Sequence, residues 1–329
     1  MQKVLVLEGD GIGPSIVDAA VRVLSDVTGE LEFINGDIGF SAYEKCGQYL
    51  PAETLDLAAE CEIILCGPVL FKAERGTKDP VATLKSQLDI YAMVKHFETL
   101  SDELGVPGIR STLWTSWSKV GQDIIETRDI DGITLTKYVR SSSYSRMMAK
   151  ALSDHEHGPS RGKVTCVTRS DLFPEATEMF VDSFQSLFGA GDWPTEIMDI
   201  QRWVSMAIKK PTQFDTVICA DLYGHVAAGV MAGLTGGNHL SPNAFIGDST
   251  ALFEPGHVYP SSDIPGDHAN PTSMIIAGAM ALFNIGMSGD ARRIMDALKQ
   301  AYADHETTPD VLGGTLSTEA FTDAVLKRI

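Results

Sequence analysis

Short apolar runs alternate with helical patterns along most of this chain, and this alternation limits the folds that it can adopt. The run KVLVLEG (residues 3–9) ends in a glycine, and IVDAAVRVLSDV (residues 16–27) follows with apolar residues at helical spacing. The further segments expected to be strands or helices are LPAETLDLAAEC, EIILCGP, KVTCVTR, EATEMFVDSFQSLF, RWVSMAIKK, FDTVICAD, PTSMIIAGAMALFNIG and ARRIMDALKQAYADH. Buried strands that alternate with helices predict an α/β protein whose mainly parallel sheet is covered on both faces.

Two stretches interrupt this alternation. Residues 97–120, which include Trp114 and Trp117, show no clear period, so an irregular crossover or an interface loop is expected there. Residues 232–273 are rich in Gly, Pro, Asn, Ser and Asp and are predicted to form a long loop region. Because loops of that length in compact domains usually carry function, this region is a candidate for a binding site.

The composition limits the partners and the location of the protein. The 329 residues, 44% of them hydrophobic, suffice for one large domain or two moderate ones. A formal charge of −18 argues against nucleic acids and anionic membranes, because both attract clustered Lys and Arg. No stretch has the roughly 20 consecutive apolar residues of a membrane span. The five cysteines lack metal-type spacing, so buried free thiols in a reducing cytoplasm are expected.

Five segments carry motifs that lie in order along nearly the whole chain. They are GDGIGP (9–14), LPAETLDLAAECEIILCGP (50–68), PTQFDTVICADLYG (211–224), ALFEPGH with DIPGDHANPTSM (251–274) and TPDVLGGTLSTEAFTDAVL (308–326). Together they resemble the β-decarboxylating dehydrogenases of the isocitrate/isopropylmalate dehydrogenase family. GDGIGP alone would be weak evidence for this family, whereas five matches in the same order are strong evidence.

The resemblance implies an α/β fold of the isopropylmalate dehydrogenase type, with two domains and a large mixed sheet flanked by helices. The first, cofactor-side domain would combine residues 1–95 with residues 236–329, and the second domain, for dimerisation and substrate, would be residues 96–235. The resemblance also implies a homodimer whose active cleft lies between the two domains.

In the family, the stretch ALFEPGHVYPSSDIPGDHANP would wrap the adenosine half of a dinucleotide. The residues that the resemblance assigns to the cofactor are Ile12, Glu254, His257, Asp263, Ile264 and Asn270. A carboxylate at Asp263 would accept from both ribose hydroxyls and repel a 2′-phosphate, which favours NAD over NADP. Val258 and Tyr259 replace small residues that the family has near the pyrophosphate, so a structural loop that binds no nucleotide is the alternative.

Basic residues stand at the positions of the three arginines with which the family binds its dicarboxylate. Lys85 and Lys95, on a segment expected to be one helix (ATLKSQLDIYAMVKH), and Arg128 would attract a small carboxylate despite the acidic total. Lysine lacks the bidentate fork of arginine, so affinity and orientation would both suffer. The alternative is that the two lysines are solvated on a helix surface.

The family's proton transfers need a lysine base and a tyrosine acid. By register, Arg169 stands at the lysine position, and an arginine cannot lose its proton near neutral pH, although it can pair with a carboxylate. Leu135 stands at the tyrosine position, and Tyr138 is the nearest replacement. His225 is a further candidate for the base.

The family's divalent metal needs three aspartates, and their positions correspond here to Gln201, His225 and Gly229. Mg²⁺ and Mn²⁺ prefer several anionic oxygens, so neither ion is expected. A substitute site that uses the nearby Asp199 and Asp221 is the alternative. The sequence therefore predicts that metal-assisted decarboxylation is lost.

Three classes of function remain open. The first is an NAD-dependent oxidoreductase that acts on a small 2-hydroxy carboxylate, with Arg169, Tyr138 and His225 at the catalytic positions. The second is a catalytically inactive homologue that binds a carboxylate or a nucleotide and has a regulatory role. The third is a different enzyme class on the same fold, since a fold does not fix a function.

Overall fold

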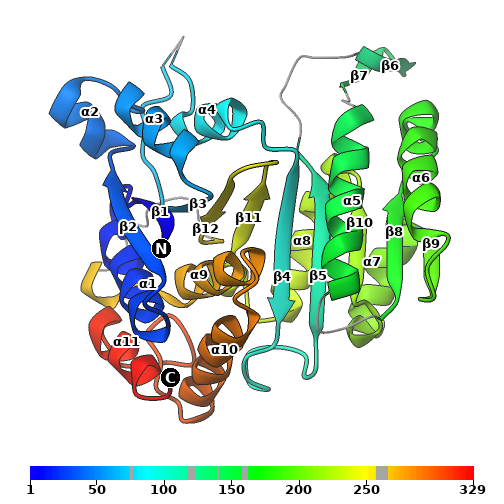
Figure 1. Ribbon diagram of the computed structural model, residues 1–329. Coiled ribbons are helices and arrows are strands. Elements are labelled where there is room, and N and C mark those ends of the chain that lie inside the picture. Colours follow the sequence, from blue (N-terminus) through cyan, green and yellow to red (C-terminus); the bar gives the residue numbers. More distant parts are fainter. Residues whose placement is uncertain (75–76, 118–123, 139–140, 158–161, 257–265) are drawn as a thin grey trace. The chain divides into compact units, whose positions relative to one another are not determined.

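The computed structural model describes residues 1–329 except 75–76, 118–123, 139–140, 158–161 and 257–265 (Figure 1). The described residues form a mixed α/β fold in which ten strands of a large sheet are flanked by helices, which confirms the expected fold class. They divide into two compact units, namely unit 1 (Met1–Ile90, Leu100–Gly105 and Gly236–Ile329) and unit 2 (Tyr91–Thr99 and Val106–Thr235). Among the helices of this described part, none combines the length and hydrophobicity needed to cross a membrane.

Unit 1 has strands in the spatial order β2-β1-β3-β12-β11, parallel except for β11, which pairs antiparallel to β12. The strands are β1 (Gln2–Leu7), β2 (Leu31–Gly36), β3 (Ile63–Cys66), β11 (Asn243–Ile246) and β12 (Ala251–Glu254). Strands β3, β11 and β12 are buried at every position, including the polar Asn243 of β11 and Glu254 of β12.

The larger helices of unit 1 pack against one another (Figure 1). They are α1 (Gly13–Val27), α9 (Thr272–Asn284), α10 (Ser288–Ala303) and α11 (Thr318–Leu326), and the smaller ones are α2 (Phe40–Cys46), α3 (Ala52–Glu60) and α4 (Pro80–Gln87). Helix α9 is apolar on all sides and buried from Thr272 to Ala279, because α1, α10 and β12 pack against it.

Unit 2 has strands in the order β4-β5-β10-β8-β9, and they are parallel except for β4, which pairs antiparallel to β5. The strands are β4 (Ala92–Glu98), β5 (Arg110–Ser116), β8 (Val164–Thr168), β9 (Thr195–Asp199) and β10 (Thr216–Cys219). A separate antiparallel pair consists of β6 (Ile124–Ile130) and β7 (Ile133–Tyr138).

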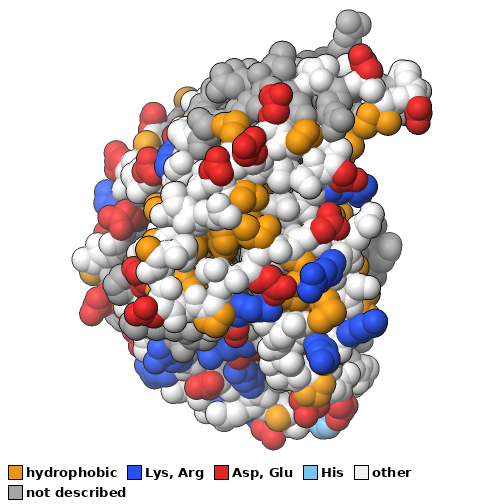
Figure 2. Space-filling model, turned by 90° about the vertical axis from the view of Figure 1, so that its right-hand side faces the viewer, with side chains coloured by type: hydrophobic (Ala, Val, Ile, Leu, Met, Phe, Trp, Pro, Cys, Tyr) orange, Lys and Arg blue, Asp and Glu red, His pale blue; other side chains and the backbone are white. Residues whose placement is uncertain are grey.

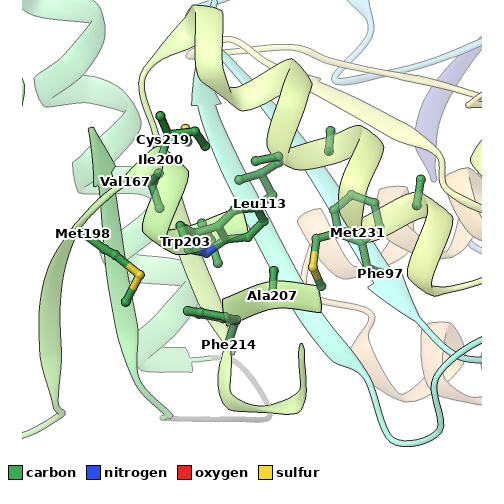
Figure 3. Close-up of a cluster of buried hydrophobic side chains, with 14 of the residues drawn as sticks. Phe97, Leu113, Val167, Met198, Ile200, Trp203, Ala207, Phe214, Cys219 and Met231 are labelled. Atoms are coloured by element: carbon green, nitrogen blue, oxygen red, sulfur yellow. The ribbon is translucent and has the colours of Figure 1, made fainter. Parts of the chain in front are cut away.

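Helices cover the sheet of unit 2 on both faces (Figure 1). Helices α5 (Ser141–His157) and α6 (Pro174–Phe188) pack together on one face, and α7 (Ile200–Lys209) and α8 (Asp221–Leu234) on the other. Under α7 and α8 lies a core cluster in which Trp203 is fully buried against Phe214 (Figure 3). Strand residues such as Leu113 and Val217 face this cluster because alternate side chains of a strand point to one face.

The segment ATLKSQLDIYAMVKH is not the single helix that the sequence predicted. Helix α4 ends at Gln87, Asp89 takes a φ of 50°, and the chain continues as β4. Lys85 therefore lies on a helix and Lys95 on a strand. The prediction was wrong because apolar spacing continued across the break, while an aspartate in the left-handed conformation ends the helix there.

Both stretches expected to be irregular contain strands. Residues 97–120 include β5, and Trp114 is buried in it. The loop region 232–273 includes the antiparallel pair β11–β12. Strand β5 (RSTLWTS) is rich in polar residues, and β11 (NAFI) and β12 (ALFE) each have only three apolar residues in a segment rich in Gly, Pro and Asn, which is why the sequence missed them. The cysteines are free thiols as expected, but Cys46 is exposed.

Candidate functional site

The turn after β1 brings the GDGIGP motif against the end of β3. Gly9 has a φ of 72°, and a side chain on it would collide with the carbonyl oxygen of Pro68, so glycine is required there. Asp10 is buried, and its carboxylate accepts from the N–H groups of Phe40, Ser41 and Leu70 at 2.9, 2.9 and 2.7 Å. One carboxylate thus holds together this turn, the start of α2 and the segment after β3.

A buried ion pair joins α4 to the end of β12. Nζ of Lys85 lies 2.9 Å from Oε2 of Glu254, and both side chains are at most 7% exposed. The other carboxylate oxygen of Glu254 accepts from Nδ2 of Asn243 at 3.1 Å, and the Lys85 ammonium lies 3.3 Å from the centroid of the Phe245 ring. Lys85, expected to bind substrate, and Glu254, expected to bind cofactor, are therefore partners of each other.

Asn270, another residue assigned to the cofactor, is buried at the start of α9. Its Oδ1 accepts from the N–H of Thr272 at 2.9 Å, and its Nδ2 donates to the hydroxyl of Tyr302 at 3.4 Å. Burial raises the pKa of Tyr302 to about 12. The N–H of Gly256, just after β12, donates to Oγ of Ser273 in the same helix. These contacts fix the points of unit 1 that flank residues 257–265.

In unit 2, the parallel strands end at one edge of the sheet, where ligands of open α/β sheets bind. Arg169 directly follows β8, and its guanidinium makes a bidentate contact with Asp171. Nε and Nη2 donate to Oδ1 and Oδ2 at 2.9 and 3.2 Å. This pairing raises the pKa of Arg169 and lowers the pKa of Asp171, so the two groups are charged across the neutral range.

The residues at the expected metal positions lie on α7 and α8. Gln201 and His225 are exposed, and Gly229 has no side chain. The carboxylate of Asp199 caps α7 and accepts from the N–H of Gln201 at 2.8 Å. Over the described residues, no three His, Cys, Asp or Glu side chains are grouped so that they could hold a metal ion. The side chain of Asp221 lies outside that description.

The remaining predicted residues are placed as follows. Ile12 is buried just before α1, and Lys95 is buried within β4. Arg128 pairs with Leu135 along β6 and β7, and Tyr138 ends β7, but the side chains of Arg128 and Tyr138 lie outside the described part. The remaining cofactor candidates, His257, Asp263 and Ile264, also lie outside it.

Comparison with known proteins identifies the family. The family model described as isocitrate/isopropylmalate dehydrogenase matches residues 3–325. The chain belongs to this family. It is 30% identical to the 3-isopropylmalate/3-methylmalate dehydrogenase of Methanocaldococcus jannaschii, over 100% of this chain and 99% of the relative.

Two further members of the family bear on the function. The crystal structure of isocitrate dehydrogenase from Methylococcus capsulatus is similar with a TM-score of 0.86 at 28% identity, and 100% of this chain and 99% of that chain are covered. A mitochondrial regulatory subunit of NAD isocitrate dehydrogenase from Dictyostelium discoideum is 26% identical, over 99% of this chain and 90% of the relative. The family thus includes proteins named as dehydrogenases and one named as a regulatory subunit.

The motifs shared with the family did not point to several residues that contact the candidate site residues in unit 1 and unit 2. Asp10 stands in the GDGIGP motif, but its contacts with residues 30 and 60 positions away are not visible in a linear pattern. Asn243 was hidden in a segment expected to be loop. Asp171 could have been found from the sequence. An aspartate two residues after an arginine at a strand end is close enough for its carboxylate to accept two hydrogen bonds from the guanidinium.

The buried Lys85–Glu254 pair predicts a strong effect on stability. Lys85→Met leaves a buried carboxylate without its cation, and we expect a loss of about 3–5 kcal/mol in the free energy of unfolding. The double variant with Glu254→Gln should lose less than the sum of the single losses, because the two residues interact directly. The measurement is urea unfolding followed by circular dichroism.

The matched control is the exposed pair of Lys3 and Glu60, 3.4 Å apart. Lys3→Met should change the stability by less than about 1 kcal/mol. Additive losses in the Lys85 and Glu254 variants would contradict the buried ion pair.

Proposed function

We propose that this protein is an NAD-dependent oxidoreductase that acts on a small 2-hydroxy carboxylate without metal-assisted decarboxylation. The observation that carries the proposal is the charged Arg169 at the end of β8, held by Asp171. The family's base would be a lysine at this position. A guanidinium cannot take up the hydroxyl proton, so the family's usual proton transfer has no acceptor here.

The proposed reaction is a hydride transfer. The carbon that bears the hydroxyl group gives a hydride to NAD⁺, the hydroxyl proton goes to a base, and the products are a 2-oxo carboxylate and NADH. His225, exposed on the second turn of α8, and Tyr138 are the candidate bases. A neutral imidazole carries a ring nitrogen that can accept a proton, so His225 is the better acceptor of the two.

The residues at the family's metal positions do not fit Mg²⁺ or Mn²⁺. An amide on Gln201, an imidazole on His225 and a glycine at 229 supply none of the anionic oxygens that hard cations prefer. The carboxylate of Asp199 already serves as the cap of α7. We therefore derive no step through a metal.

NAD as the cofactor is supported by the expected ribose contact of Asp263 and by the relative named as a subunit of NAD isocitrate dehydrogenase. In unit 1, Glu254 and Asn270 are engaged in internal hydrogen bonds, so we assign them to the support of the loop and not to direct nucleotide contact. Lys95 and Arg128, with Lys85 neutralised by Glu254, remain the proposed cations for the substrate.

A second candidate is a catalytically inactive homologue that binds a carboxylate or a nucleotide and regulates a partner. The observation that favours it is the similarity to a protein named as a regulatory subunit, combined with the arginine at the base position. Both candidates would bind a carboxylate or a nucleotide, but only the oxidoreductase would turn over a substrate.

Turnover with and without metal tests the proposal. We expect NAD⁺ reduction at 340 nm with at least one of malate, tartrate, isocitrate or isopropylmalate, unchanged by Mg²⁺ or EDTA and without release of CO₂. NAD binding in calorimetry without any turnover would select the regulatory candidate. Metal-dependent CO₂ release would contradict the proposal, and absence of both binding and turnover would leave only a different enzyme class.

We further propose a homodimer. The support is the family, together with exposed apolar side chains on neighbouring helices of unit 2, since Ile208 on α7 is 60% exposed and Val226 on α8 is 54% exposed. On the face in Figure 2, hydrophobic side chains lie together between acidic and basic ones. Exposed apolar groups of this kind mark protein interfaces when they are contiguous.

Gel filtration with light scattering at micromolar concentration should give twice the chain mass of 35.5 kDa. Val226→Lys should shift the mass towards one chain, because it replaces an exposed apolar side chain of the proposed interface by a charge. Asp18→Lys, an exposed change on α1 of unit 1, is the control that should leave the mass unchanged. A monomer for the unaltered protein would contradict the homodimer.

A further inference from the structure

The geometry of the Arg169–Asp171 pair leaves one side of the guanidinium open. A guanidinium carries five N–H groups in a planar fork, and the side-on contact with Asp171 uses Nε and one hydrogen of Nη2. Nη1 makes no hydrogen bond to any residue within the described ranges, and the arginine side chain is 32% exposed. The end-on edge of the fork, formed by Nη1 and Nη2, therefore faces neither Asp171 nor another described partner.

The backbone around this pair is fixed from two sides. Arg169 follows directly on β8, whose register with β9 and β10 is continuous. Its carbonyl oxygen accepts from Oγ1 of Thr177 in the first turn of α6, at 3.2 Å. The guanidinium thus has a defined position at the carboxyl edge of the sheet, where bound ligands are found in this class of fold.

We infer that Arg169 anchors the carboxylate of the ligand through Nη1 and Nη2, and that Asp171 is the positioning residue that turns the guanidinium towards it. The inference rests on the proposed function for the class of the ligand, a small 2-hydroxy carboxylate. A planar fork matches the two oxygens of a carboxylate, which a lysine at this position cannot do. Arg169, which stands at the position of the family's lysine base, would thereby contact the ligand.

The surrounding charges set the strength of this contact. Asp199 lies close enough to act on the charge of Arg169, and so does the half-buried Tyr223. The N–H of Gln201 and the start of α7 partly neutralise Asp199, and Asp171 is already paired. Because the site is acidic and partly open to solvent, we expect a modest contribution, about tenfold in affinity for a charge-assisted pair.

Binding of L- and D-malate, tartrate and isocitrate to the full chain, measured by calorimetry without nucleotide or metal, tests the inference. Arg169→Met should weaken the best ligand about tenfold, and Arg169→Lys should weaken it nearly as much, because lysine lacks the fork. Asp171→Asn should weaken it by a smaller factor, about threefold, since the guanidinium loses its orientation but keeps its charge. The diamide of the best ligand, which has no carboxylate, should bind the unaltered protein and the variants equally.

The control is Arg202→Met on α7, whose guanidinium is 3.9 Å from Glu196 and 70% exposed. It should leave the affinity unchanged, and the melting temperatures should show that every variant is folded. The inference would be overturned if Arg169→Met and the unaltered protein bound the carboxylate with equal affinity. It would also be overturned if none of the carboxylates bound the unaltered protein at millimolar concentration. Carboxylate binding that depends on Arg169 without any turnover would sustain the inference while it overturns the proposed hydride transfer.

Discussion

The parallel arrangement of β5, β10, β8 and β9 is the constraint on which the chemistry of unit 2 depends. Parallel strands end at the same edge, so the residues that follow them meet there whatever their distance in sequence. Arg169 after β8, Asp199 at the end of β9 and the start of α8 after β10 are brought to that edge in this way. The core cluster around Trp203 holds α7 and α8 against the sheet and so fixes their first turns.

Two cations at expected ligand positions have an internal carboxylate as partner. Lys85 is paired with Glu254 inside unit 1, where both side chains are buried. Arg169 is paired with Asp171 in unit 2, where about a third of the arginine side chain is exposed. The lysine is therefore part of the framework, whereas the arginine keeps donors for a ligand. The difference follows from burial and from the five donors of a guanidinium.

Much of the fold could be predicted from the sequence, because apolar runs of strand length and helices with one apolar face leave a clear period. KVLVLEG and IVDAAVRVLSDV became β1 and α1 as expected. The break at Asp89 was not predictable from periodicity, since a single residue with positive φ changes the chain direction without changing the apolar spacing. Strands β11 (NAFI) and β12 (ALFE) were missed because each has only three apolar residues beside a polar one.

The sequence indicated which residue types stand at the positions of the candidate site, but it indicated only a few of the contacts that these residues make. The assignment of Arg169 to the position of the family's base, and of Gln201 and Gly229 to positions of its metal ligands, was inferred from ordered motifs and stays a prediction. The partners of Lys85 and Asp10 did not, because each contact joins segments far apart in the chain. Long-range pairs of this kind depend on the packing of whole elements, which local sequence patterns do not encode.

We propose that a cation and neutral groups stand in this protein where the family's reaction would need a base and three metal-binding carboxylates. Titration of the protein with Mn²⁺ in the presence of a carboxylate ligand, followed by electron paramagnetic resonance, tests it most directly. We expect the signal of free Mn²⁺ to rise with each addition as it does in buffer, apart from weak and unsaturable binding to the acidic surface. A saturable site that takes up one Mn²⁺ per chain at micromolar concentration would contradict it.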